Sequence, residues 1–265
     1  MKKGKKIMLI AGIIIPVMAL WLAFCGWQWS WGPFAKLHDA KLAKLPGNAE
    51  AYAPEHAGEV ENSPLAGKHI VFLGSSITQG YASMGASFAD YIALRNAYTV
   101  TKEAVPGTTL SGGSPDSYIP RMKRLDTEMK VDLFVCQLST NDTWKNKALG
   151  EISTDGKYDT STVAGAIEFI ISYAKDTWDC PVVFYTNPPF EDAKYPEMVA
   201  LLHGIADKWG ITVIDMWSDE NFNAITEEQH ALYMADHIHP TRAGYLEWWT
   251  PYMEPLLYAA LNAQS

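Results

Sequence analysis

The chain has 265 residues, 48% of them hydrophobic, and its formal net charge is −9. This length and composition predict one globular domain of ordinary size plus an appendage. An acidic chain of this kind is a poor candidate for binding nucleic acid or anionic lipid through its surface. Its three cysteines are too few for a disulfide framework, and their spacing matches no zinc site.

Residues 1–34 are predicted to form a membrane anchor. Four lysines within the first six residues precede an uncharged stretch, residues 7–34. Residues 7–24 reach the ~18–20 apolar residues that span a bilayer, and the lysines favour a cytoplasmic N-terminus. Trp27, Trp29 and Trp31 follow, as in an interfacial aromatic belt. The first interpretation is an uncleaved signal anchor with the rest of the chain outside the cytoplasmic membrane. The alternatives are a lipoprotein modified at Cys25, a cleaved signal peptide, and a buried core helix.

Residues 35–67 carry three prolines and scattered charge without a long apolar run. This pattern predicts a stalk or linker, with a short helix over residues 36–44. The folded domain is predicted to occupy residues 68–265.

From residue 68 onward, short apolar segments alternate with helical ones. The pattern predicts strands over residues 69–73, 98–103, 131–138, 181–186 and 211–215. Helices are predicted over residues 88–96, 118–129, 162–177, 195–209 and 241–261. Near-continuous apolar strands separated by helices indicate a five-stranded parallel sheet in a three-layer α/β/α domain. Residues 143–160 are predicted to form a hairpin or flap over the sheet edge.

The segment from His69 to Gly80 places serines just beyond the first predicted strand. An α/β sheet exposes side chains to a crevice beyond the carboxyl ends of its strands. Ser76 is therefore a candidate nucleophile, because the backbone N–H groups after such a turn can face a developing oxyanion. The alternative is a serine that caps a helix.

Near the C-terminus, Asp236 and His239 are three residues apart, which lets them face the same way on a helical turn. An imidazole held by a carboxylate is the base that a serine nucleophile needs. One alternative is a polar turn that ends at Pro240. Another is a metal site of Asp236, His237 and His239, although no second cluster of His or Cys lies nearby.

Two further segments that follow predicted strands contain candidate oxyanion donors. Gly107 lets a backbone N–H approach a ligand closely, and Asn141 can donate from its side-chain amide. The alternatives are a simple turn glycine and a helix cap at Asn141 and Asp142. Trp144 is a candidate for stacking on a sugar ring, with ordinary aromatic packing as the alternative.

These four segments resemble, in order, the sequence blocks of the SGNH (GDSL-type) hydrolases over roughly residue 68 to the C-terminus. The first block, Gly-Asp-Ser-Ile-Thr-x-Gly, is matched except that Ser75 replaces the aspartate. The third, Gly-x-Asn-Asp, is matched except that Ser139 replaces the glycine, and the last, Asp-x-x-His-Pro, is matched in full. The Gly-x-Ser-x-Gly elbow of the α/β-hydrolases does not surround Ser76.

The resemblance implies a flavodoxin-like sheet order and assigns roles to particular residues. Ser76 is implied as the nucleophile, His239 as the base and Asp236 as the partner that orients it. The implied oxyanion hole combines the backbone N–H groups of Ser76 and Gly107 with the side chain of Asn141.

We therefore expect a serine esterase or acylhydrolase that forms an acyl-enzyme. The expected substrates are small-molecule, glycan or lipid esters outside the cytoplasmic membrane, with a deacetylase-like activity on glycans. Neither a metal nor an organic cofactor is implied, and no nucleic acid partner is expected. The alternatives are a non-catalytic glycan-binding surface module and an acyltransferase that uses the same serine.

Overall fold

The computed structural model describes residues 2–29, 32–34 and 36–262. Its central sheet has five parallel strands in the order β2-β1-β3-β4-β5. The strands are β1 (His69–Gly74), β2 (Thr99–Ala104), β3 (Leu133–Gln137), β4 (Val182–Tyr185) and β5 (Thr212–Ile214). The predicted five-stranded parallel sheet is thus confirmed.

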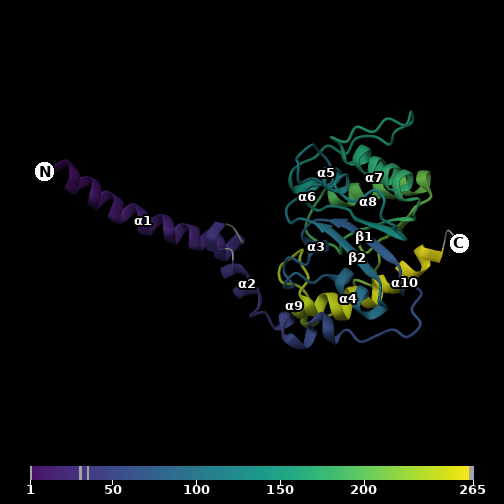
Figure 1. Cartoon of the computed structure of the whole chain (residues 1–265), viewed down its shortest axis with the longest axis horizontal. Coiled ribbons are helices and arrows are strands. Elements are labelled where there is room, and N and C mark those ends of the chain that lie inside the picture. The colour runs from purple at the N-terminus through teal and green to yellow at the C-terminus, as the bar shows by residue number, and fades with distance from the viewer. Residues whose placement is uncertain (1, 30–31, 35, 263–265) are drawn as a thin grey trace.

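Helices cover both faces of the sheet, which confirms the three-layer arrangement (Figure 1). One face carries α7 (Val163–Trp178) and α8 (Tyr195–Trp209), and the other carries α4 (Phe88–Asn96) and α10 (Thr250–Asn262). The side chains of β3 and β4 are all buried. Because burial of each large apolar side chain contributes about 1.5–3 kcal/mol, these two strands contribute strongly to the stability of the core. α8 ends at Gly210 in the left-handed conformation, as predicted.

Three predicted elements differ from the structure. The helix predicted over residues 118–129 is only α5 (Tyr118–Met122), and Asp126 accepts the Glu128 N–H in a turn beyond it. The helix predicted over residues 241–261 begins as a π-helical segment, Gly244–Trp249, before α10. Residues 143–160, predicted to form a hairpin or flap, do not form a hairpin: residues 145–161 are described throughout and contain no strand. Aspartate turns at Asp155 and Asp159 organise this loop instead.

The register of the strands brings three loops to one edge of the sheet. β1 lies between β2 and β3, with Gly74 opposite Ala104 and Leu73 opposite Cys136. The segments that follow these strands therefore begin side by side. Accordingly, the two short helices α3 (Ser76–Gln79) and α6 (Asn141–Trp144) lie at the same end of the domain (Figure 1).

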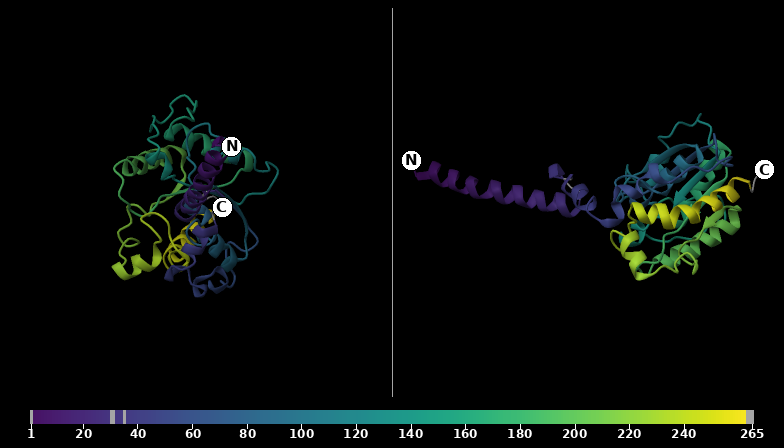
Figure 2. Two further views of the ribbon diagram at one scale, coloured as in Figure 1. Left: turned by 90° about the vertical axis from the view of Figure 1, so that its left-hand side faces the viewer. Right: turned by 90° about the horizontal axis from the view of Figure 1, so that it is seen from below.

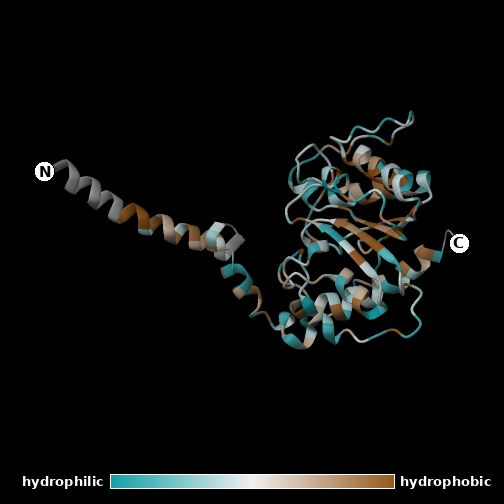
Figure 3. Ribbon diagram, in the orientation of Figure 1, coloured by the Kyte–Doolittle hydropathy of each residue, from teal (hydrophilic) through white to brown (hydrophobic). Residues whose placement is uncertain are grey.

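The N-terminal helix α1 (Lys2–Trp29) projects away from the domain, and α2 (Lys36–Leu42) follows it (Figures 1 and 2). Apolar residues dominate the part of α1 nearer the domain (Figure 3). Within the described residues no single helix is long and apolar enough to cross a membrane. Ile13–Trp27 and Gly32–Leu42 meet that test only as a pair bent by 52°. Trp31 of the predicted aromatic belt lies outside the described residues, as do residues 1, 30 and 35.

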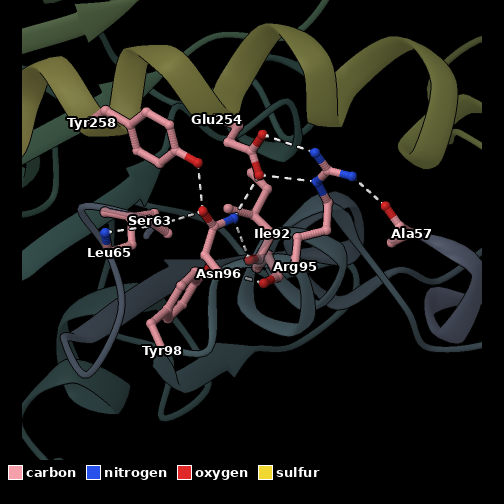
Figure 4. Close-up of polar contacts among 10 residues, drawn as sticks. Ala57, Ser63, Leu65, Ile92, Arg95, Asn96, Tyr98, Glu254 and Tyr258 are labelled. Carbon is pink, nitrogen blue, oxygen red and sulfur yellow. Dashed lines mark hydrogen bonds and ion pairs between the residues drawn. The ribbon is translucent and has the colours of Figure 1, made fainter. Parts of the chain in front are cut away.

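Part of the segment predicted as a linker lies against the domain (Figure 4). Asn96 of α4 accepts hydrogen bonds from the hydroxyls of Ser63 and Tyr258, both at 2.5 Å. Arg95 pairs with Glu254 of α10 at 3.0 Å and also donates to a backbone carbonyl of the linker. Residues 57–65 therefore bond directly to α4, through the same two side chains that bond α10.

Candidate active site

Ser76 is the first residue of α3 and follows directly on β1. A side chain at Gly74 would place Cβ 1.7 Å from the Thr78 hydroxyl, so only glycine fits there. Gln137 of β3 accepts hydrogen bonds through Oε1 from the Ser75 N–H at 2.9 Å and from the Thr78 hydroxyl at 2.8 Å. These bonds tie the turn that presents Ser76 to the neighbouring strand. Ser75, which replaces the family's aspartate, is buried in this contact.

The structure brings Ser76, His239 and Asp236 into one hydrogen-bonded series. His239 Nε2 lies 2.8 Å from Ser76 Oγ, and His239 Nδ1 lies 2.8 Å from Asp236 Oδ2. Asp236 Oδ1 also accepts the backbone N–H groups of Ile238 and His239, each at 2.8 Å. Burial raises the pKa of Asp236, but the hydrogen bond and charge of His239, with these N–H donors, hold that pKa at about 2. The carboxylate is thus ionised and orients the imidazole towards the serine.

The two predicted oxyanion donors lie on either side of β1. Gly107 follows β2 with a φ of +74°, a conformation that favours glycine. Asn141 begins α6 after β3, and its side-chain amide donates to the Thr108 carbonyl at 3.0 Å. Asn141 is therefore tied directly to the Gly107 loop, which places both donors beside the segment that carries Ser76.

Asp142 holds the Gly107 loop in place rather than capping its own helix. Its buried carboxylate accepts the Leu110 N–H at 2.7 Å, the Ser111 N–H at 3.0 Å and the Ser111 hydroxyl at 2.6 Å. The alternative interpretation of Asp142 as a helix cap is therefore wrong. Hydrogen bonds to a carboxylate are roughly twice as strong as neutral ones, so this contact fixes the loop firmly.

Arg121 of α5 was not predicted to take part in the site. Its fully buried guanidinium donates to the carbonyls of Gly74 and Glu103, each at 2.7 Å, and of Asp116 at 2.8 Å. It also reaches the Thr108 hydroxyl at 3.2 Å. One side chain thus joins the ends of β1 and β2 to the Gly107 loop. In the sequence Arg121 is one of three basic residues at positions 121–124, a pattern that by itself specifies no partner.

Aromatic side chains flank the Ser76–His239 pair. The Tyr81 ring lies 5.3 Å from the His239 ring and stacks on His38 of α2 at 5.1 Å, measured between centroids. Trp144, which is 60% exposed, stacks on His237 at 5.7 Å with an interplanar angle of 14°. Trp144 therefore lies next to the loop that carries Asp236 and His239. The sequence reasoning missed Tyr81.

The cysteines do not contribute to this site. Cys136 and Cys180 are buried free thiols. Burial, with the nearby charge of Asp179, raises the pKa of Cys180 to about 12, which disfavours the thiolate. Within the described part of the chain, no group of three His, Cys, Asp or Glu side chains is arranged to hold a metal ion.

Comparisons with known proteins give a consistent family and fold. The GDSL-like lipase/acylhydrolase family model matches residues 72–246. A Lactobacillus plantarum protein shares the fold with a TM-score of 0.62 and 18% identity, covering 73% of this chain and 98% of its own. A GDSL-like lipase candidate from Bacteroides ovatus has a TM-score of 0.57 and 18% identity, and the match covers 73% of this chain and 99% of that one. A variant of an acetyl-xylooligosaccharide esterase from Geobacillus has a TM-score of 0.52 and 15% identity, and the match covers 74% of this chain and 95% of that one. Comparison with curated protein sequences gives no significant match.

Proposed function

Because the chain belongs to the GDSL-like lipase/acylhydrolase family and is therefore an ester-hydrolysing enzyme, we propose that it works through an acyl-serine on Ser76. The observation that carries this proposal is the 2.8 Å contact between Ser76 Oγ and His239 Nε2, with Asp236 on the opposite ring nitrogen. A hydroxyl hydrogen-bonded to an oriented imidazole is the arrangement that activates a serine nucleophile.

His239 relays two protons in turn: the Ser76 proton passes to the leaving alcohol, and a proton from water later passes to Ser76. Nε2 takes the proton of Ser76 Oγ as that oxygen attacks the ester carbonyl carbon, and Asp236 stabilises the resulting imidazolium. The Ser76 and Gly107 N–H groups and the Asn141 amide hold the negatively charged oxygen of the tetrahedral intermediate. When the intermediate collapses, the imidazolium gives its proton to the leaving alkoxide. Water then attacks the acyl-serine with His239 as base, which releases the acid and restores Ser76.

The direct test is Ser76→Ala with p-nitrophenyl acetate as substrate. We expect kcat to fall about 10⁴–10⁶-fold, because the nucleophile is lost while binding remains. Ser172→Ala is the matched control, since Ser172 lies on α7 and its hydroxyl donates to Asp176 of the same helix. Full hydrolysis by Ser76→Ala would refute the mechanism, whereas loss of activity in the control alone would point to a different site.

For the substrate, the features near the site favour a glycan ester with a short acyl group. The exposed Trp144 indole, stacked on His237, offers an aromatic face of the kind that packs against sugar rings. A structural neighbour that hydrolyses acetylated xylooligosaccharides supports the same class. Comparison of acetyl, butyryl and longer-chain p-nitrophenyl esters tests the acyl part. We expect kcat/KM to be highest for acetyl, and a maximum at a long chain would instead favour a lipid ester.

We also infer that residues 1–34 hold the catalytic domain at the outer side of the cytoplasmic membrane. The support comes from the sequence, in which four lysines precede an uncharged stretch of 28 residues, 7–34. Mass spectrometry of the mature protein decides between the anchor and the two alternatives that involve cleavage, a lipoprotein and a cleaved signal peptide. The anchor predicts an N-terminus that retains the lysines, and loss of all residues before Cys25 would rule the anchor out.

A further inference from the structure

A cavity of about 600 Å³ lies between α2 and the loop that follows α3. This volume is within the ~300–1,000 Å³ that is usual for small-molecule sites. The cavity borders the proposed catalytic residues, because Tyr81 packs on His239 and Pro106 directly precedes Gly107. Its wall is made of Asp39 and Leu42 from α2, Gln79, Tyr81 and Met84 around the end of α3, and Pro106.

Hydrogen bonds hold α2 in place as one wall of this cavity. The buried Asn48 amide donates to the Leu42 carbonyl of α2 at 2.9 Å and to the Ala82 carbonyl at 2.8 Å. Asn48 Oδ1 accepts the N–H of Arg242 at 2.9 Å, three residues after His239. One buried side chain thus joins α2, the opposite wall of the cavity and the segment that carries the histidine.

The lining of the cavity selects for an uncharged ligand rich in hydroxyl groups. Asp39 is an exposed carboxylate that only accepts hydrogen bonds, and the Gln79 amide both donates and accepts. Leu42, Met84 and Pro106 supply C–H surfaces between these polar groups. The Asp39 carboxylate and the net charge of −9 disfavour an anionic ligand. An acyl chain has no hydroxyl to donate to the carboxylate and would gain nothing from either polar group.

The position of Tyr81 indicates which half of the ester this cavity serves. In the proposed mechanism His239 returns its proton to the leaving alkoxide, so the alcohol half must lie next to the imidazole. Tyr81 contacts that imidazole and also lines the cavity. Burial raises the pKa of Tyr81, as do the charges of Asp236 and Asp39, so the phenol is within electrostatic reach of both carboxylates.

We propose that this cavity binds the alcohol half of the ester, as a sugar or similar polyhydroxylated group, with Asp39 accepting a hydrogen bond from one hydroxyl. The proposal rests on the serine esterase mechanism above and adds a substrate site to it. α2 precedes residues 72–246, the part of the chain that matches the family model. The α2 side of the cavity, which carries Asp39, therefore lies outside the region that matches the family model.

The test compares two acetyl esters on the full-length protein: a mono-acetylated methyl glucoside, which retains free hydroxyls, and p-nitrophenyl acetate, which has none. Asp39→Ala removes the acceptor, and Asp39→Trp fills the cavity; both changes are at an exposed helical position that accommodates them. Asp207→Ala is the matched control, an exposed helical aspartate on α8. We expect Asp39→Ala to lower kcat/KM for the sugar ester about tenfold more than for p-nitrophenyl acetate, mainly through KM. Asp39→Trp should lower kcat/KM for the sugar ester further, and the control should leave kcat/KM unchanged for both esters.

The outcomes separate this proposal from the proposed function. If the Asp39 variants affect both esters equally, the cavity is not the alcohol site although the esterase mechanism stands. If Ser76→Ala retains hydrolysis of p-nitrophenyl acetate, the mechanism itself fails. A selective rise in KM for the sugar ester in both Asp39 variants supports the site.

Discussion

Replacement of Arg121 by methionine should destabilise the domain and the active site together. The guanidinium is fully buried and donates to three backbone carbonyls, those of Gly74, Glu103 and Asp116. Methionine keeps much of the apolar volume but removes these hydrogen bonds and the 3.2 Å ion pair with Glu103. The Gly74 carbonyl keeps the Val105 N–H at 3.4 Å, whereas a buried acceptor left without a donor costs about 1–3 kcal/mol. Because removal of the buried charge also removes its desolvation penalty, we expect the free energy of unfolding to fall by about 3–5 kcal/mol.

Urea unfolding of the full-length protein in detergent, followed by tryptophan fluorescence, measures this change. Arg124→Met is the matched control, because Arg124 is exposed and its side chain donates to the Pro115 carbonyl. Its stability should change by less than about 0.5 kcal/mol. Arg121→Lys keeps the charge but loses the planar fork, so its stability should fall between those of wild type and Arg121→Met. If Arg121→Met were as stable as Arg124→Met, the inference that Arg121 ties the two strand ends to the Gly107 loop would be refuted.

Three further changes test the site. Asp236→Asn should lower kcat about 10⁴-fold, because the imidazole loses its orienting carboxylate, and near-normal turnover would contradict that role. Since the pKa of Asp236 is about 2, below its unfolded value of ~3.9, its ionised form stabilises the fold above about pH 4. The difference in thermal stability between wild type and Asp236→Asn should therefore shrink as pH falls from 4 to 2; a constant difference would contradict this. Asn141→Ala should lower kcat about 10²–10³-fold with little change in KM, and an effect on KM alone would assign it to binding. Asn48→Ala should lower stability by about 2–4 kcal/mol through its unpaired buried partners, and an unchanged melting temperature would show that α2 is not held by Asn48.

The strands and the long helices could be predicted because their signals are local. The run of apolar residues around Val135 is long enough for a buried strand, and Gly210 marks the end of α8 by its backbone freedom. The position of Ser76 follows from the same logic, because a serine after a buried strand of a parallel sheet lies at the edge where ligands bind. The spacing of Asp236 and His239 predicted their pairing for a similar local reason.

The residues that hold the site together could not be predicted, because their partners are distant in sequence. Arg121 reaches the carbonyl of Gly74, 47 positions away, and Asn48 reaches the N–H of Arg242, 194 positions away. No periodicity or spacing encodes such contacts. For Asp142 a local signal was misleading. Aspartate commonly caps helices, but this carboxylate instead accepts the Leu110 N–H in the loop that follows β2. The helix predicted at residues 118–129 failed because apolar periodicity continued past the point where Asp126 forms a turn.

The central claim is that Ser76 is the residue that becomes acylated. Incubation of the full-length protein with a fluorophosphonate, followed by peptide mapping with mass spectrometry, tests this claim most directly. We predict one phosphonyl group per chain, on the peptide that contains Ser76, and loss of labelling in His239→Ala. A stoichiometric adduct on any other serine, together with loss of esterase activity and an unmodified Ser76, would contradict the claim.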